Sequence, residues 1–252
     1  MRITKHISFF YIENRILYVN KILDETNKYE LVTDVFIHTN NDGLTKETFN
    51  DYSNGSLSII YHDLSKIHPF YLTWKCRELL KEQKDMYDIF IYTEDDMLIP
   101  YNAIKYWLKY NRQLIDHNYN LGFLRIEVEN NNEYVTDLPR KKFNSRLLLD
   151  EEHYCINNIN PYCAIWIYNK DEFNNFVHSK YYDIKNIPGY EIRERSAIGL
   201  HGASNYWYKG TLIPIINNKL ISDCRIYHMP NNYVINKRNH WATILFDDSL
   251  QL

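Results

Sequence analysis

Two kinds of hydrophobic spacing alternate along the first half of the chain. Apolar residues follow strand-like patterns over 3–12, 31–38, 56–63 and 87–93. Between these segments they recur every three or four residues, as on one face of a helix, over 13–27, 69–84 and 100–116. Strands that alternate with helices are typical of βαβ units. We therefore expect an α/β fold with a mixed, mainly parallel central sheet and helices on both of its faces.

The second half of the chain has a less regular pattern. Its strand-like segments are 121–129, 161–168, 211–216 and 219–228, and a helical pattern covers 170–179. Residues 130–160 are polar and charged, and are predicted to form a long loop with short pieces of structure. Because no repeat or linker is visible, the sequence predicts a single domain with two halves, 1–118 and 119–252, the second carrying a smaller sheet and loops.

Composition narrows the class of protein. The 252 residues are 45% hydrophobic, enough for a sizeable core, and the net charge of −3 argues against a nucleic-acid partner. No stretch approaches the roughly 18 apolar residues of a membrane span. The N-terminal segment fits a β-strand better than a signal peptide, and the four cysteines form no CxxC pair, so we expect a cytoplasmic protein with reduced thiols. The abundance of Asn, Ile, Lys and Tyr indicates AT-rich coding, as in a low-GC microbe or a large DNA virus.

Three adjacent acids, Glu94, Asp95 and Asp96, follow a strongly apolar strand in the stretch YTEDDMLIP. Side chains alternate in an extended chain, so Glu94 and Asp96 are expected on one side and Asp95 on the other. One interpretation is a solvated acidic turn that favours the N-terminus of the helix beginning at Pro100. The other, which the apolar strand favours, is a site where a divalent cation offsets the repulsion, because ligands bind at the carboxyl ends of strands in open parallel sheets.

The stretch LTWKCRELLKEQKDMYDIFIYTEDDMLIPYNAIKYW resembles the nucleotide-sugar-dependent glycosyltransferases of the GT-A fold, in which a helix, a metal-binding strand and a second helix occur in this order. LGFLRIEVE and NPYCAIWIY also resemble the segments that come next in such chains. The resemblance implies a Rossmann-like GT-A domain whose first half binds the donor and whose second half binds the acceptor. It implies a metal-dependent transferase that moves a sugar from a nucleotide-diphosphate sugar, with a UDP-sugar as the expected donor, to a glycan or protein.

The resemblance also implies roles for single residues. Asp96 would bind Mn²⁺ or Mg²⁺ directly, with His228 as a further ligand and His240 as the runner-up. Glu94 and Asp95 would contact the donor sugar, the ribose or metal-bound water. At the ends of earlier strands and in the following helix, Thr39, Asp63 and Arg77 are the candidates for binding the nucleotide. For two of them there is a plainer interpretation: an ordinary turn for Thr39, and a solvated helix face for Arg77.

An acceptor hydroxyl needs a general base if the reaction inverts the anomeric centre. Glu191 and Glu194 are the leading candidates, Asp137 and Glu127 the others. Arg193 and Arg195 could hold diphosphate, or could form a surface ion-pair network with the glutamates. Gly189, Gly199 and Gly202 suggest a loop that approaches a ligand, and the aromatic run Tyr206, Trp207 and Tyr208 could stack on a sugar or belong to the core.

Two further classes of function remain open. A metal-dependent nucleotidyl- or phosphoryl-transfer enzyme would also cluster carboxylates, but the phosphate-loop patterns GxxxxGK[ST] and GxGxxG are absent from the sequence. A non-catalytic protein that binds carbohydrate or nucleotide would keep the same fold. Binding of nucleotides in the presence of Mn²⁺ separates these classes.

Overall fold

The computed structural model describes residues 1–187, 191–197, 210–236 and 240–251. The chain divides into two compact units: Met1–Met97 with Ala164–Ala197, and Leu98–Cys163 with Ile198–Leu252. This division differs from the predicted one at residue 118. The first unit includes a strand and a helix from the second half of the sequence. The second unit includes the long helix α3 (Tyr101–Asp116), which packs on β6 (Tyr119–Leu121).

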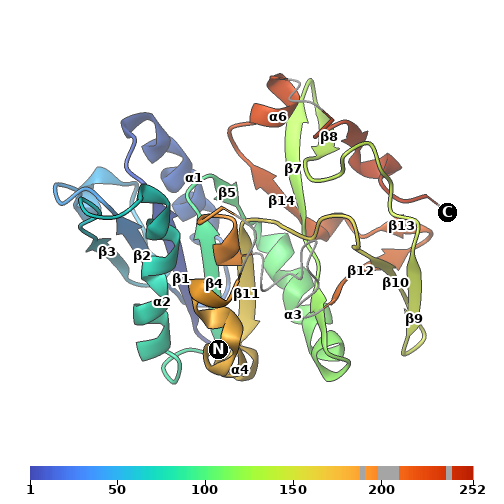
Figure 1. Cartoon of the computed structure of the whole chain (residues 1–252), viewed down its shortest axis with the longest axis horizontal. Helices are drawn as coiled ribbons and strands as arrows, with labels where there is room; N and C mark the ends of the chain where they lie inside the picture. Colours follow the sequence, from blue (N-terminus) through green and yellow to red (C-terminus); the bar gives the residue numbers. More distant parts are fainter. Residues whose placement is uncertain (188–190, 198–209, 237–239, 252) are drawn as a thin grey trace. The chain divides into compact units, whose positions relative to one another are not determined.

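The first unit contains a five-stranded sheet in the order β11-β4-β1-β2-β3 (Figure 1). Its strands are β1 (Ile3–Phe9), β2 (Thr33–Thr39), β3 (Leu57–Tyr61), β4 (Ile89–Glu94) and β11 (Ile165–Asn169). The first four run parallel and β11 pairs antiparallel with β4. The predicted α/β class and mainly parallel sheet are therefore confirmed, and β4, which lies between two strands and is buried throughout, has the internal position that its apolar sequence indicated.

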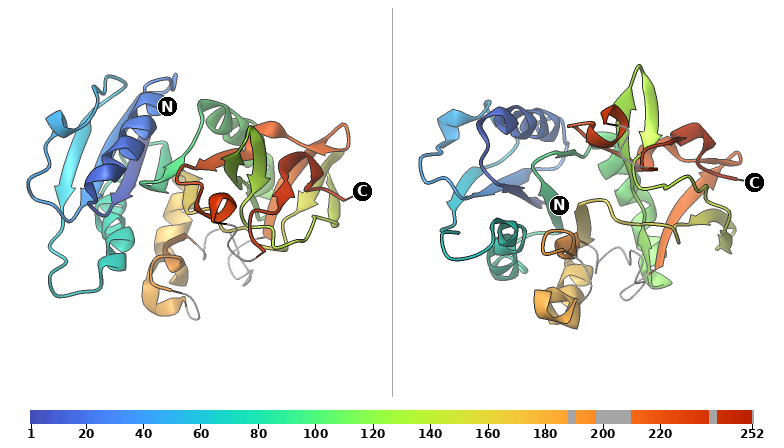
Figure 2. Two further views of the ribbon diagram at one scale, coloured as in Figure 1. Left: turned by 90° about the horizontal axis from the view of Figure 1, so that it is seen from above. Right: turned by 45° about the horizontal axis from the view of Figure 1, so that its top comes forward.

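Side-chain alternation along β1 shows that helices cover both faces of this sheet. The Lys5 ammonium donates to Thr26 Oγ1 (2.8 Å) at the end of α1 (Ile16–Thr26), whereas the neighbouring Thr4 hydroxyl donates to Gln83 Oε1 (2.9 Å) at the end of α2 (Leu72–Glu82). Because adjacent side chains of a strand point to opposite faces, α1 and α2 lie on opposite sides, as Figure 2 also shows. The helix α4 (Lys170–His178) shares the face of α2, since its Phe173 stacks on Phe90, which is opposite Thr4 in the register.

Three histidines form a hydrogen-bonded chain across the face that α2 covers. His6 Nδ1 lies 2.8 Å from His38 Nε2, and His38 Nδ1 lies 2.8 Å from His62 Nε2, with the rings stacked in turn. At the buried end, His6 Nε2 is 3.0 Å from Gln83 Oε1. Burial lowers the pKa of His6 to about 3 and, with the neighbouring histidines, lowers that of His38 well below its ordinary value. The inner two imidazoles are thus neutral at pH 7, and each can donate one hydrogen bond and accept another.

The second unit is built from shorter strands in two sheets. One has the order β13-β12-β10-β9, with β6 paired to β12, and the other has the order β15-β8-β7-β14-β5. The bounds of these strands are β5 (Met97–Leu98), β7 (Leu124–Glu129), β8 (Asn132–Val135), β9 (Arg146–Leu149), β10 (Glu152–Ile156), β12 (Gly210–Ile216), β13 (Lys219–Leu220), β14 (Arg225–His228) and β15 (Ile244–Leu245). A short helix, α6 (Asn232–Ile235), comes after β14.

One prediction for the second unit is confirmed and another was wrong. The segment 130–160 is a long connection with three short strands, β8, β9 and β10, as its sequence predicted. The predicted strand 121–129 is interrupted at Gly122, whose N–H donates to the Leu212 carbonyl (2.7 Å). A Cβ at Gly122 would lie 2.7 Å from Ile213 Cγ1, so the close approach of the two strands requires glycine there.

Short 3₁₀ turns complete the two units. They are η1 (Glu13–Arg15), η2 (Lys46–Thr48), η3 (Pro69–Tyr71), η4 (Lys180–Tyr182), η5 (Ile184–Asn186), η6 (Ser222–Cys224) and η7 (Phe246–Asp248). Among the helices within the described ranges, none has the length and apolar character that crossing a membrane would require.

Candidate functional site

The acidic triplet lies at the carboxyl end of β4 and is buried. Glu94 is the last residue of the strand, and Asp95 and Asp96 form the turn that leads into β5. The exposed fractions of the three residues are 6%, 5% and 8%. The backbone holds the turn in place, because Asp95 N–H donates to the Ser8 carbonyl of β1 (3.1 Å). A solvated acidic turn is therefore wrong for this segment.

Two arginines neutralise part of the triplet. One nitrogen of Arg15, in the turn η1 after β1, lies 2.8 Å from Asp95 Oδ1 and 2.6 Å from Asp96 Oδ2. Glu94 instead faces Arg193, whose Nε is 3.6 Å from Glu94 Oε2. The predicted alternation, with Glu94 and Asp96 together, was wrong because the strand ends at Glu94 and the following turn brings Asp95 and Asp96 to the same arginine.

Asp95 carries an oxygen that no described residue satisfies. Its Oδ2 is buried and accepts no hydrogen bond within the described ranges, while Oδ1 is held by Arg15. Burial, and next the charge of Asp96, raise the pKa of Asp95 well above its ordinary value, although Arg15 lowers it. A buried oxygen of this kind takes up either a proton or a cation.

A cavity of about 450 Å³ opens beside the triplet in the first unit. Most of its wall is apolar and comes from the ends of β1 and α2, whereas one end is charged. The lining residues are Ser8, Phe10, Ile12, Arg15, His68, Pro69, Phe70, Leu72, Thr73, Glu94, Asp95 and Arg193. The apolar wall suits an apolar ligand group, whereas an anionic group at the charged residues requires a cation beside it, because three acids there face two arginines.

The geometry restricts the kind of metal site that the triplet can form. Within the described residues, no group of three or more His, Cys, Asp or Glu side chains is arranged to hold a metal ion. The vacant Asp95 Oδ2 does fit a hard cation that takes one or two carboxylates from the protein and its other ligands from substrate phosphates and water, as Mg²⁺ commonly does. The vacant oxygen belongs to Asp95, whereas Asp96, the predicted direct ligand, has its Oδ2 engaged by Arg15.

The Glu–Arg segment 191–197 lies next to this site. Arg193 spans the two acids, since its guanidinium also lies 3.8 Å from Glu194 Oε1, and the Trp74 indole anchors the segment by donating to the Ile192 carbonyl (2.8 Å). Glu194 Oε2 is buried with no hydrogen-bond partner among the described residues, and Glu191 is exposed. Glu194, rather than Glu191, is therefore linked to the acidic triplet, through the Arg193 that it shares with Glu94. The predicted glycines 189, 199 and 202 and the aromatic run 206–208 lie outside the described residues.

The predicted nucleotide ligands in the first unit fall at different places. Thr39 ends β2, is fully buried, and its Oγ1 accepts from Asn41 N–H (3.3 Å), so it caps a turn. Asp63 lies after β3 and accepts from Ser65 N–H (2.9 Å); that bond lowers the pKa of Asp63. Neither lines the cavity beside the triplet.

Arg77 has a structural position that neither predicted interpretation anticipated. It is 4% exposed, so it is not a solvated helix face, and its guanidinium donates to the carbonyls of Tyr181 (3.1 Å), Tyr182 (2.6 Å) and Ser196 (2.8 Å). Its guanidinium carbon also lies 4.0 Å from the centre of the Trp74 ring. With these groups engaged, Arg77 ties α2 to the segment after α4 and is not free to bind phosphate.

Asp137 and His228 belong to the second unit. Asp137 accepts two hydrogen bonds from Arg125 (2.7 and 3.0 Å). Burial raises the pKa of Asp137 although Arg125 opposes the rise, and because both carboxylate oxygens are engaged by Arg125 the residue is badly placed to act as a general base. His228 Nδ1 lies 2.5 Å from Glu127 Oε1, and the other Glu127 oxygen accepts from the N–H groups of Tyr233 and Val234. A carboxylate at Nδ1 orients Nε2 as the ligand atom, the arrangement typical of metal-binding histidines. His240 is exposed.

Sequence reasoning missed Arg15. Its signal was present in the sequence as a cation in the connection after the first strand, where the carboxyl end of β1 meets that of β4. No protein-family model matches the sequence, and neither does any curated protein.

Proposed function

We propose that this protein is a glycosyltransferase that uses a nucleotide-diphosphate sugar, with a UDP-sugar as the expected donor. The observation that carries the proposal is the buried acidic triplet at the end of β4, with a vacant Asp95 oxygen beside a cavity whose wall is largely apolar. The apolar wall suits a nucleobase, and the charged end suits a diphosphate near a divalent cation.

Topology supports this position for a nucleotide. In the order β4-β1-β2-β3, the chain moves from β1 to one side through β2 and β3, then crosses to the other side of β1 to form β4. The strand order therefore reverses between β1 and β4, and nucleotides bind open α/β sheets in the crevice at such a switch point. Arg15 follows β1 and the acidic triplet ends β4, so both flank this point.

The chemical task of the site is to stabilise the negative charge that develops on the leaving diphosphate. A divalent ion held by Asp95 together with the donor would supply Lewis-acid stabilisation. The side chains contribute fixed charges: Arg15 orients Asp95 and Asp96, and Arg193, whose side chain is 39% exposed, can reach a phosphate from the cavity rim. Glu194 is the proposed general base for the acceptor hydroxyl, because its Oε2 is buried next to this charge cluster.

Calorimetry with UDP and GDP, with and without Mn²⁺, tests the proposal. We expect Mn²⁺-dependent binding to the wild-type protein, and a loss of at least about tenfold in Asp95→Asn, which keeps the shape but removes the charge. The matched control is Asp51→Asn, an exposed acid in the same unit, which should bind as the wild type does.

The outcome then separates the functional classes. No affinity for any nucleotide or nucleotide-sugar would reject the proposal. Mn²⁺-dependent binding without hydrolysis or transfer of any donor in a nucleotide-sugar screen would favour a non-catalytic binding protein with the same site.

A further inference from the structure

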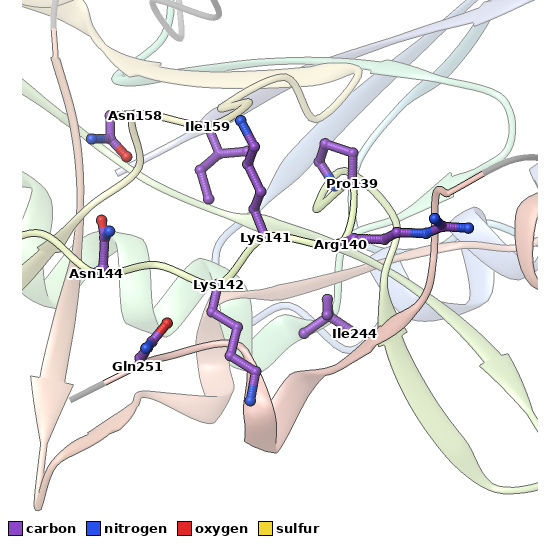
Figure 3. Close-up of a pocket in the computed structure, with 9 residues that line it drawn as sticks. All are labelled: Pro139, Arg140, Lys141, Lys142, Asn144, Asn158, Ile159, Ile244 and Gln251. Atoms are coloured by element: carbon purple, nitrogen blue, oxygen red, sulfur yellow. The ribbon is translucent and has the colours of Figure 1, made fainter.

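A second hollow, of about 690 Å³, lies in the second unit and is lined by cations and amides (Figure 3). Its cations are the three consecutive residues Arg140, Lys141 and Lys142, and its amides are Asn144, Asn158 and Gln251. Pro139, Ile159 and Ile244 supply the apolar part. No described residue that lines the hollow is acidic, although the whole chain carries a net charge of −3.

The three cations are not neutralised within the described part of the chain. None of them forms an ion pair with another described residue, and all three are exposed. Three adjacent like charges repel one another, so this arrangement is unfavourable unless solvent or an anionic ligand balances it.

The basic segment is held in place and is not a loose surface tail. Buried residues flank it: Leu138 is 1% exposed and Phe143 is not exposed at all. Phe143 exchanges backbone hydrogen bonds with the C-terminal segment, donating to the Ser249 carbonyl (2.7 Å) and accepting from Gln251 N–H (2.7 Å). Arg140 adopts a φ of 56°, a left-handed conformation that residues other than glycine rarely adopt. The backbone that carries the three cations is therefore held in one conformation by the residues on either side of it.

The directions of the side chains indicate the shape of the ligand. In Figure 3, Lys141 and Lys142 leave the loop on opposite sides and Arg140 extends in a third direction. Such a spread does not converge on one phosphate ion, but it can meet several anionic groups spaced along a chain. The three amides add donors and acceptors that suit hydroxyl groups.

We propose that this hollow binds an acidic saccharide, an oligosaccharide with several carboxylate or sulfate groups. A nucleic acid is the less favoured polyanion, because the lining residues include no aromatic side chain on which a base could stack. Binding at this site does not require the transferase activity and is independent of the proposed function.

Fluorescence-based titration of the full chain with four probes of equal length tests the proposal. The probes are hexagalacturonate, a heparin-derived hexasaccharide, neutral maltohexaose and the oligonucleotide dT6. We expect one or both acidic hexasaccharides to bind with an affinity that falls as salt rises, and maltohexaose not to bind measurably. Which acidic probe binds identifies carboxylate or sulfate as the recognised group.

The decisive variant is the triple substitution Arg140→Gln, Lys141→Gln and Lys142→Gln. It should weaken acidic saccharide binding by about tenfold or more, as expected for the loss of three exposed charge contacts. The matched control removes three exposed cations elsewhere in the same unit, Lys105→Gln, Arg112→Gln and Lys219→Gln, and should change the affinity by no more than about twofold.

Three results would overturn the proposal: no binding of either acidic hexasaccharide, equal losses in the triple variant and its control, or dT6 binding at least as tightly as both saccharides. Circular dichroism of both variants checks that they fold. Because the probes contain no nucleotide-sugar, failure here leaves the donor-binding experiment unaffected, and failure of donor binding leaves this result standing.

Discussion

Replacing Arg15 with glutamine should raise the affinity of the donor-free protein for Mn²⁺. Arg15 holds Asp95 Oδ1 at 2.8 Å and Asp96 Oδ2 at 2.6 Å, so its positive charge lies close to Asp95 Oδ2, where the metal is proposed to bind, and repels a cation there. The substitution releases both oxygens and removes a positive charge from the acidic triplet. If Arg15 had only a structural role, its loss would disorder the acidic turn, and Mn²⁺ binding would be unchanged or weaker.

The magnitude comes from the distances. Charges of +2 and +1 about 5 Å apart repel by about 1.7 kcal/mol even in a water-like dielectric, which is slightly more than tenfold in affinity. The same change should cost stability: removing one partner of a buried pair costs about 3–5 kcal/mol, and the partial exposure of the Arg15 side chain, 23%, reduces this to about 2 kcal/mol.

Free Mn²⁺ measured by electron paramagnetic resonance during titration gives the affinity, and urea unfolding gives the stability. Arg15→Lys keeps the charge and should bind Mn²⁺ within about twofold of the wild type. Arg112→Gln, an exposed arginine of α3, controls for the change in overall charge. Unchanged or weaker Mn²⁺ binding by folded Arg15→Gln would refute the reasoning.

Three further predictions concern buried charges and pH. His6 has a pKa of about 3 in the folded protein and about 6.5 when unfolded, so its contribution to the free energy of unfolding is complete above pH 6.5 and is lost as the pH falls. In urea unfolding, this residue should make the protein about 2 kcal/mol less stable at pH 5 than at pH 7. The variant His6→Asn should remove that difference. Arg77→Met should lower the free energy of unfolding by about 3 kcal/mol, because it leaves three buried carbonyls without their donor. Nucleotide affinity should stay unchanged below the melting temperature; a changed affinity would indicate that Arg77 binds the nucleotide. Asp137→Asn should destabilise by about 3 kcal/mol in calorimetric melts, because the Arg125 charge stays buried without its partner; a change below about 1 kcal/mol would contradict the buried ion pair.

Local pattern was enough to predict most elements of the first unit. The strands β1 to β4 and the helices α1 and α2 lie where the hydrophobic spacing placed them, because burial of one face leaves a period in the sequence. The position of the acidic triplet at the end of an internal strand comes from the same pattern. The strands β8 to β10 were predicted only as short pieces of structure within 130–160, because strands of four or five half-exposed residues show too few repeats of the pattern to be placed.

The partners of the charged residues could not be predicted in this way. Arg15 lies 80 residues from Asp95 in the sequence, and Arg77 lies 119 residues from Ser196. These contacts exist because β1 lies beside β4 and because the chain returns to the first unit through β11 and α4. That order of strands cannot be predicted from the residues around Arg15 or Arg77.

The sequence by itself thus determined the α/β class, the mainly parallel sheet and the place of three acids at a strand end. Only the tertiary structure decided that two arginines share the charge of those acids, that the vacant oxygen belongs to Asp95 and that Arg77 is a structural residue. The physical reason is the separation along the sequence of the residues that interact. Hydrophobic periodicity is visible within a few neighbouring residues, whereas charge compensation depends on which distant strand ends the folded sheet brings together.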